Sequence, residues 1–305
     1  MLKAEIEMMA IKKRETIFVL EGNLDSEVIA RIKVENSIQL VNINGLIDKT
    51  LNRKTERRKL DGNKILVEDV TKYLLDSGFL NVIGIQDTDL DSILRWYKKN
   101  KFEHPNTSKN IVQTFPARDI ETLLYSQLEK SSKFTPQFPL KLEDCIKRSI
   151  VLAIIGISLK LWNSKNKTIP DIGLKKFSEE YRGKLEDYYT ICKSIETLLP
   201  KVVEFNSNQL KQEHVVSLEK TVKSVNERIN ESNLSWSSLI RGHDLESLLV
   251  NFNNMEVRNK YVKEIKKRIN DKLVRLGEYE ILKSHEMFKS IEKWRFDRNL
   301  EPFFA

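Results

Sequence analysis

Residues 16–25 read TIFVLEGNLD. The run Thr16–Leu20 is apolar at nearly every position and rich in residues that favour extended chain, which is typical of a strand buried on both faces of a parallel sheet. Glu21 ends this run, and Asn23 can cap a helix that continues to about residue 31. The segment therefore predicts a strand, a short connection and a helix, which together form the first part of a βαβ unit.

The same alternation of strand and helix continues through residue 130. Short apolar runs predict three more strands, at residues 38–43, 81–85 and 111–115. Helical spacing of apolar residues predicts helices at residues 67–75 and from about residue 118 to 130. This order predicts an α/β fold, in which helices lie on both faces of a mainly parallel sheet.

The second half of the sequence predicts helices only. Residues 142–162 are apolar on nearly all sides, which indicates a central buried helix, and residues 177–199 form an amphipathic helix that Pro200 is expected to end. Residues 209–230 are mostly polar, whereas apolar residues recur every four positions over residues 257–273. We therefore expect an α/β domain at residues 1–140 and an all-helical domain at residues 141–305, with a helical core that includes Trp162, Trp236 and Trp294.

Composition narrows the class of protein. The chain has 305 residues, of which 52 are Lys or Arg and 44 are Asp or Glu, and 40% are hydrophobic. This hydrophobic fraction excludes a disordered chain, and having only Cys145 and Cys192 excludes a disulfide scaffold and a zinc ribbon. The longest apolar run, residues 150–159, is about half the ~20 residues that a membrane span needs. We expect a soluble, cytoplasmic protein with no membrane partner, whose net charge of +8 suits a polyanionic partner.

Acidic residues follow two of the predicted strands directly. Glu21 is the first residue after one strand, and Asp87 and Asp89 are the first acids after another. Ligands of a parallel sheet bind beyond the carboxyl ends of its strands, so neighbouring strands would bring these carboxylates together. Mutual repulsion would then favour a bound Mg²⁺ (or Mn²⁺), which prefers oxygen ligands. The alternative is that these acids cap helices or lie in solvated turns, and the sequence leaves both possibilities open.

Three segments together resemble a known family. FVLEGNLD (residues 18–25), GIQDTDLD (84–91) and FPARDIETLL (115–124) resemble the TOPRIM fold of topoisomerases, primases and related nucleases. Their order and spacing are most similar to the TOPRIM-like nuclease family of bacterial phage defence. The resemblance covers about residues 15–130, and extends weakly to RGHDLESLL (241–249) and to IEKWRFDRNLEPFF at residues 291–304.

The resemblance assigns roles to residues of the acidic segments. It implies that Glu21 is a general acid/base or a metal ligand, and that Asp87 and Asp89 are metal ligands. Arg118 stands where relatives often have histidine. Secondary members of the acidic site would be Asp25, Asp91, Asp119 and Glu121. Asp119 and Glu121 could equally cap the helix that follows them.

The resemblance also implies an activity. Members of this family act as metal-dependent nucleases, so the chain would be a Mg²⁺-dependent enzyme, an endoribonuclease that cleaves host tRNA. A partner ATPase (AriA-like) would restrain it, and a phage trigger would release it as a homodimer to cause abortive infection. The helical half would then serve in dimerisation or partner docking. The alternative is a non-catalytic TOPRIM-fold binding module that docks to the partner ATPase.

Within the first domain, positive charge is densest at residues 49–64, which include seven basic residues and two acidic ones. A nuclease with an acidic site needs positive charge to hold a polyanion, so this segment is a candidate for phosphate contacts. The predicted nucleic-acid-binding residues are Arg53, Lys54, Arg57, Arg58 and Lys59. The segment could instead be a solvated loop or a protein-docking site. Trp96 and Tyr97 could stack on a base or pack in the core.

Overall fold

The computed structural model describes residues 16–32, 38–43, 62–88, 90–103, 109–130, 142–166, 172–182, 185–257 and 282–303. These residues pack into two compact units. The first unit contains the described residues up to Thr88, those from 109 to Glu129, and residues 282–303. The second contains residues 90–103 and the described residues between Lys130 and 257.

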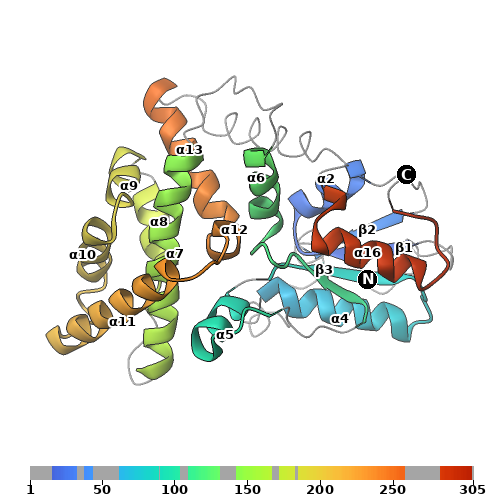
Figure 1. Ribbon diagram of the computed structural model, residues 1–305, viewed down its shortest axis with the longest axis horizontal. Helices are drawn as coiled ribbons and strands as arrows, with labels where there is room; N and C mark the ends of the chain where they lie inside the picture. Colours follow the sequence, from blue (N-terminus) through green and yellow to red (C-terminus); the bar gives the residue numbers. More distant parts are fainter. Residues whose placement is uncertain are drawn as a thin grey trace. The chain divides into compact units, whose positions relative to one another are not determined.

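The first unit is built on a four-stranded parallel sheet (Figure 1). Its spatial order is β2-β1-β3-β4. Leu20 of β1 lies opposite Asn42 of β2 and Ile85 of β3, so the strands end at the same edge of the sheet. The predicted α/β fold with a parallel sheet is confirmed. The strands are β1 (Thr16–Leu20), β2 (Ile38–Asn42), β3 (Val82–Gln86) and β4 (Ile111–Gln113).

Helices lie on both faces of this sheet (Figure 1). Side chains alternate along β1: Ile17 and Val19 join the apolar core formed with α4 (Gly62–Asp76). Phe18 points to the opposite face, where its ring centroid lies 5.4 Å from that of Phe303. Because both faces of β1 are covered, all five of its residues are buried, which explains the unbroken apolar run in the sequence. The remaining helices of the unit are α2 (Asn23–Ile32), α6 (Ile120–Lys130) and α16 (Glu286–Phe296).

Gly84 allows α4 to approach β3 closely. A Cβ atom at this position would lie 2.6 Å from Ile111 Cδ1, 2.7 Å from Thr71 Oγ1 and 2.8 Å from Val67 Cγ1. We therefore expect Gly84→Ala to lower the free energy of unfolding by about 1–3 kcal/mol, the usual cost of overpacking a core. Denaturant titration measures this change. Gly173→Ala is the matched control, because nothing lies within 4 Å of the position that its added methyl group would take; equal losses in both variants would contradict the packing argument.

Residues 282–303 pack on the sheet of the first unit. Trp294 Nε1 donates a hydrogen bond to Asn110 Oδ1 at 3.1 Å, and the buried Arg295 donates from Nη1 to Thr16 Oγ1 at 3.0 Å. Trp294 therefore belongs to the sheet unit, and its predicted place in the helical core is wrong. The two units also differ from the predicted continuous domains, 1–140 and 141–305, because residues 282–303 cover a face of the sheet and residues 90–103 join the helical unit.

The second unit is all-helical in its described residues, as predicted (Figure 1). Helix α7 lies at its centre and buries Ile155 and Trp162, while α10, α11, α12 and α13 all contact it. No helix among the described residues combines the length and apolar character needed to cross a bilayer. The helices are α5 (Asp91–Lys99), α7 (Leu142–Lys165), α8 (Leu174–Arg182), α9 (Leu185–Ile191), α10 (Ile195–Phe205), α11 (Gln212–Asn230), α12 (Trp236–Leu239) and α13 (Gly242–Val257).

The single helix predicted at residues 177–199 is wrong. Three helices, α8, α9 and α10, cover this part of the chain, and α10 continues through Pro200 to Phe205. A new helix begins after Ser194, whose backbone N–H donates to Thr197 Oγ1 at 3.2 Å in a capping arrangement. Pro200 lies inside α10, past its first turn, so the helix lacks the backbone hydrogen bond that a residue with an N–H at this position would donate, and Pro200 does not end the helix as predicted.

Candidate active site

Two acidic residues meet where β1 and β3 end. These strands are direct neighbours, Glu21 follows β1, and Asp87 follows β3. The backbone N–H of Asp87 donates a hydrogen bond to Glu21 Oε1 at 3.1 Å. Both side chains are half-buried at the carboxyl edge of the sheet, the place where a parallel sheet presents ligand-binding groups. The structure thus brings together two of the three residues predicted to be catalytic.

Two further acids from the same predicted set are buried and held by backbone groups. Asp25, in the first turn of α2, accepts the Gly22 N–H on Oδ2 at 2.8 Å. Asp119 accepts the Thr122 N–H on Oδ1 at 2.9 Å, so it caps the start of α6 as one of the two alternatives predicts. These hydrogen bonds fix the directions of both carboxylates without neutralising their charge.

The charges of this acidic group act on Asp87. Burial raises the pKa of the Asp87 carboxyl well above its ordinary value of 3.8. The negative charges of Asp25, Asp119, Glu21 and Glu121, in decreasing order, raise the same pKa further. Five of the predicted acidic residues therefore lie close enough to interact electrostatically, in a unit whose sheet holds them at one edge.

The other predicted site residues have no described position or side chain. Asp89 and the basic residues Arg53, Lys54, Arg57, Arg58 and Lys59 fall outside the described residues. Asp91 begins α5 in the second unit, and its side chain is not described. Their roles as metal ligand, secondary acid and phosphate contacts remain predictions.

The donor chemistry of the acidic group fits a hard divalent cation. Carboxylate oxygens are the ligands that Mg²⁺ prefers, and a nearby cation would lower the raised pKa of Asp87. Glu21 and Asp87 would hold the ion, with Asp89 as the third predicted ligand. Within the described ranges, no three acidic, histidine or cysteine side chains already form a metal-binding group. The described residues thus supply two of the three predicted ligands.

A buried pair of threonines positions the turn that carries Asp87. The Thr88 N–H donates to Thr114 Oγ1 at 3.1 Å and to the Arg118 carbonyl oxygen at 2.9 Å. The Thr88 and Thr114 hydroxyls lie 3.3 Å apart. These bonds join the end of β3 to the loop that leads to Asp119. The backbone of Arg118 is therefore part of this frame, while the phosphate contact considered for its side chain remains a prediction.

Gln86, the last residue of β3, ties the same turn to α4. Its Nε2 donates to the Lys64 carbonyl oxygen at 2.8 Å and to Glu68 Oε1 at 3.1 Å. Neither Gln86 nor the threonine pair was identified from the sequence. One signal in the sequence could have found them: polar residues flank Asp87 at the end of an apolar strand. Polar side chains that become buried there need hydrogen-bond partners, so they indicate a hydrogen-bonded turn.

Comparisons with known proteins leave the family open. No protein-family model matches this chain, and a search of curated proteins finds none with significant similarity. The resemblance to TOPRIM-like nucleases therefore remains a prediction from the three sequence segments. A proposal for the function has to rest on the geometry of the acidic group.

The raised pKa of Asp87 predicts how stability depends on pH. Between the ordinary pKa of 3.8 and the higher folded value, the unfolded chain has lost the Asp87 proton and the folded chain retains it. The free energy of unfolding therefore falls as pH rises through this window. Above the folded-state pKa it falls no further on account of Asp87, because the carboxyl is then ionised in both states. We expect Asp87→Asn to raise the melting temperature of metal-free protein at pH 8 by roughly 2–4 °C, the shift that about 1 kcal/mol produces.

Thermal unfolding in EDTA at pH 8 and pH 4 measures this effect. The difference between Asp87→Asn and wild type should shrink at pH 4, because the wild-type carboxyl is then protonated in the folded state. Asp76→Asn, at an exposed position in α4, is the matched control and should change the melting temperature little. A stabilisation of Asp87→Asn that is equal at the two pH values would contradict the electrostatic cause.

Proposed function

We propose that this protein is a metal-dependent nuclease that acts on RNA. The observation that carries the proposal is the contact between Glu21 and the Asp87 backbone at the carboxyl edge of the sheet, with Asp25, Asp119 and Glu121 close enough to raise the Asp87 pKa. Clustered carboxylates repel one another, and a cation bound between them relieves this repulsion. Cations held by carboxylates also promote phosphoryl transfer, because they stabilise the charge of the phosphate.

The residues of the cluster have distinct tasks in this proposal. A bound Mg²⁺ would supply charge stabilisation for the phosphate and orient a water molecule. Asp87 would hold the ion in its ionised form. Of the two roles that the resemblance allows for Glu21, this proposal uses the general acid or base, which would exchange a proton with the attacking or leaving oxygen. The Thr88–Thr114 pair holds the turn that carries Asp87, and Asp25 accepts the N–H of Gly22, next to Glu21, so the site needs little rearrangement.

The biological setting of the proposal rests on the sequence resemblance alone. The likeness is to AriB, the effector nuclease of PARIS phage-defence systems. On this basis the protein is an effector in the cytoplasm that a partner ATPase restrains, and that cleaves host tRNA once released as a homodimer. Its unrestrained expression would then be toxic. The second unit provides the surface for dimerisation or for the ATPase in this proposal.

Incubation of the purified protein with bulk tRNA and with plasmid DNA tests the activity. Cleavage of tRNA in Mg²⁺ or Mn²⁺ that EDTA abolishes supports the proposal, and cleavage of plasmid alone would change the substrate to DNA. Calorimetric titration with Mn²⁺ tests the metal site independently. Absence of both metal binding and cleavage, with binding to a partner ATPase retained, would replace the proposal by the non-catalytic binding module.

A further inference from the structure

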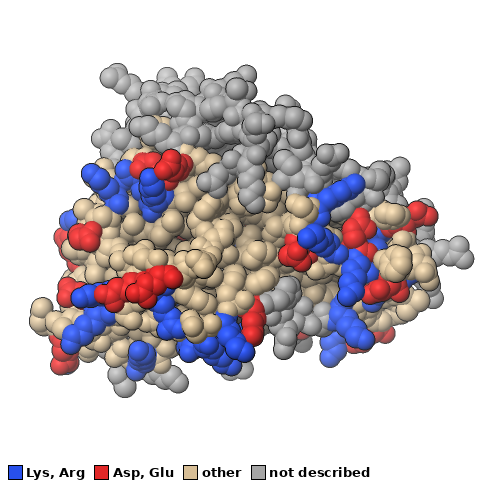
Figure 2. Space-filling model, viewed as in Figure 1, with Lys and Arg blue, Asp and Glu red and all other residues tan. Residues whose placement is uncertain are grey.

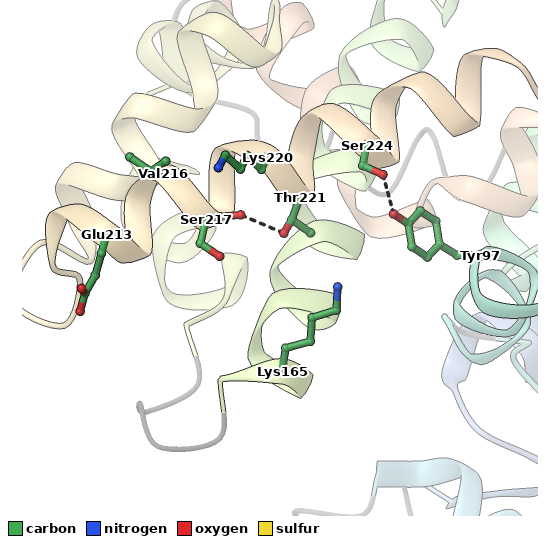
Figure 3. Close-up of a pocket in the computed structure, with 8 residues that line it drawn as sticks. All are labelled: Tyr97, Lys165, Glu213, Val216, Ser217, Lys220, Thr221 and Ser224. Atoms are coloured by element: carbon green, nitrogen blue, oxygen red, sulfur yellow. Dashed lines mark hydrogen bonds between the residues drawn. The ribbon is translucent and has the colours of Figure 1, made fainter.

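We propose that a pocket in the second unit binds phosphate groups of a nucleic-acid strand. The pocket has a volume of about 380 Å³ and lies where α5, α7 and α11 meet (Figure 3). Hydroxyl and ammonium groups dominate its lining. The residues that supply them are Tyr97, Lys165, Ser217, Lys220, Thr221 and Ser224.

The fold of α11 explains why these groups gather. This helix buries Leu218, Val222 and Val225 on one side, and it contacts α7. Its other side is free to present polar residues, and Ser217, Thr221 and Ser224 follow at helical spacing. Figure 3 shows Lys165 extending from the end of α7 toward α11. Tyr97 of α5 closes the pocket at one end, with its hydroxyl 2.9 Å from Ser224 Oγ.

Two lysines, Lys165 and Lys220, outnumber the one carboxylate, Glu213, among the described residues that line the pocket. Neither Lys165 nor Lys220 makes an ion pair with a carboxylate of the described residues. Lys165 also complements the dipole at the end of α7, but this explanation does not apply to Lys220, in the middle of α11. Glu213 lines the end of the pocket opposite Tyr97, where it lies 3.6 Å from His214 Nε2 (Figure 3).

More positive charge surrounds the Tyr97 end. The guanidinium carbon of Arg228 lies 5.0 Å from the centroid of the Tyr97 ring. Lys98 and Lys99 are exposed in the last turn of α5, and Figure 2 shows Lys and Arg side chains over this helix. Positive charge that continues from a pocket along a helix is the electrostatic pattern expected for a polyanionic strand.

The chemistry of the lining favours phosphate over a base. The ammonium groups of Lys165 and Lys220 and the Ser217 hydroxyl can donate to phosphate oxygens, which are acceptors only, whereas the Thr221 hydroxyl donates to the Ser217 carbonyl oxygen at 3.0 Å. Trp96 is buried, so its ring is not available to stack on a base and the core-packing alternative holds for it. Tyr97 is half-buried and contributes its hydroxyl to the pocket. The choice of a nucleic acid, rather than another phosphate compound, rests on the proposed nuclease function.

Binding of a fluorescent single-stranded RNA, measured by anisotropy in EDTA, tests the pocket without cleavage. We expect the double variant Lys165→Ala, Lys220→Ala to weaken binding at least tenfold at low salt. Its slope of log affinity against log salt should fall by about 1.4, because each lost phosphate contact on a single strand removes roughly 0.7. Ser224→Ala, which removes one hydroxyl and keeps the charge, should weaken binding less and leave the slope unchanged.

The matched control removes two exposed lysines outside the pocket, Lys160 of α7 and Lys176 of α8. The variant Lys160→Ala, Lys176→Ala changes the net charge equally and should keep nearly wild-type affinity and slope. Circular dichroism and thermal unfolding check that both double variants fold. Equal effects of the two double variants, or RNA binding by the pocket variant at wild-type strength, would overturn the inference.

The outcomes separate this inference from the proposed function. If the pocket variant loses RNA binding and no condition gives cleavage, the pocket is a nucleic-acid site and the nuclease proposal fails. If wild-type protein cleaves RNA and the pocket variant binds and cleaves normally, the nuclease proposal stands and the pocket inference fails. Binding of inorganic phosphate or free nucleotide without RNA would also overturn the inference.

Discussion

Replacing Glu21 by glutamine should lower the rate of RNA cleavage by roughly a hundredfold to ten-thousandfold, the range that loss of a general acid or base produces. The substitution keeps the shape of the side chain and a carbonyl oxygen that can accept the Asp87 N–H, so the contact now 3.1 Å long should survive. It removes the negative charge and the exchangeable proton. Initial rates of tRNA cleavage in Mg²⁺ measure the effect, with thermal unfolding as the check on folding.

Glu27 provides the matched control, because it is exposed on α2, close in sequence to the site. Glu27→Gln should cleave within about twofold of wild type. In cells, Glu21→Gln should relieve the growth arrest that unrestrained expression causes, and Glu27→Gln should not. A Glu21→Gln protein that is folded and fully active would remove Glu21 from the reaction and leave the acidic cluster without its proposed role.

Replacing Phe303 by alanine should have the largest effect on stability, a loss of about 3–5 kcal/mol in the free energy of unfolding. The Phe303 ring is fully buried, and its centroid lies 5.4 Å from that of Phe18 and 6.4 Å from that of Phe288. Its backbone N–H also donates to Glu292 Oε2 at 3.2 Å. Truncation to alanine leaves a cavity between β1 and α16 that these rigid elements cannot close.

Phe296 is the matched control, since it lies in α16 with 81% of its surface exposed. Phe296→Ala should change stability by no more than about 0.5 kcal/mol. Denaturant unfolding followed by circular dichroism compares the two. Nearly equal stability of the two variants would contradict the packing of the chain end on the sheet, and so would a Phe303→Ala protein that unfolds as wild type does.

The sequence predicted the parts of the fold that depend on local pattern. Strand β1 is buried on both faces, so its sequence is a continuous apolar run, and this run predicted the strand correctly. Glu21 and Asp87 were placed together because one residue directly follows each strand, and parallel neighbours end at one edge of the sheet. The meeting of these two residues was predicted only on the condition that their strands are neighbours, and the structure supplies that pairing of β1 with β3.

Contacts between distant segments were not predictable in this way. Helical spacing identifies α16 as a helix, yet it does not say which surface the helix covers, and Trp294 was assigned to the wrong core. The bond between Arg295 and Thr16 joins residues that no local pattern relates. Similarly, the Thr88–Thr114 pair depends on the register between β3 and β4. A single sequence does not specify that register.

The packing of residues 282–303 on β1 has a consequence during protein synthesis. Thr16 and Arg295 are separated by 279 positions, and the helical unit lies between them in the chain. At about 5–20 residues per second, a ribosome needs on the order of tens of seconds to travel from one to the other. Throughout that time Phe18 lacks the contact with Phe303 and α16, so we expect the nascent chain to bind chaperones until residues 282–303 emerge.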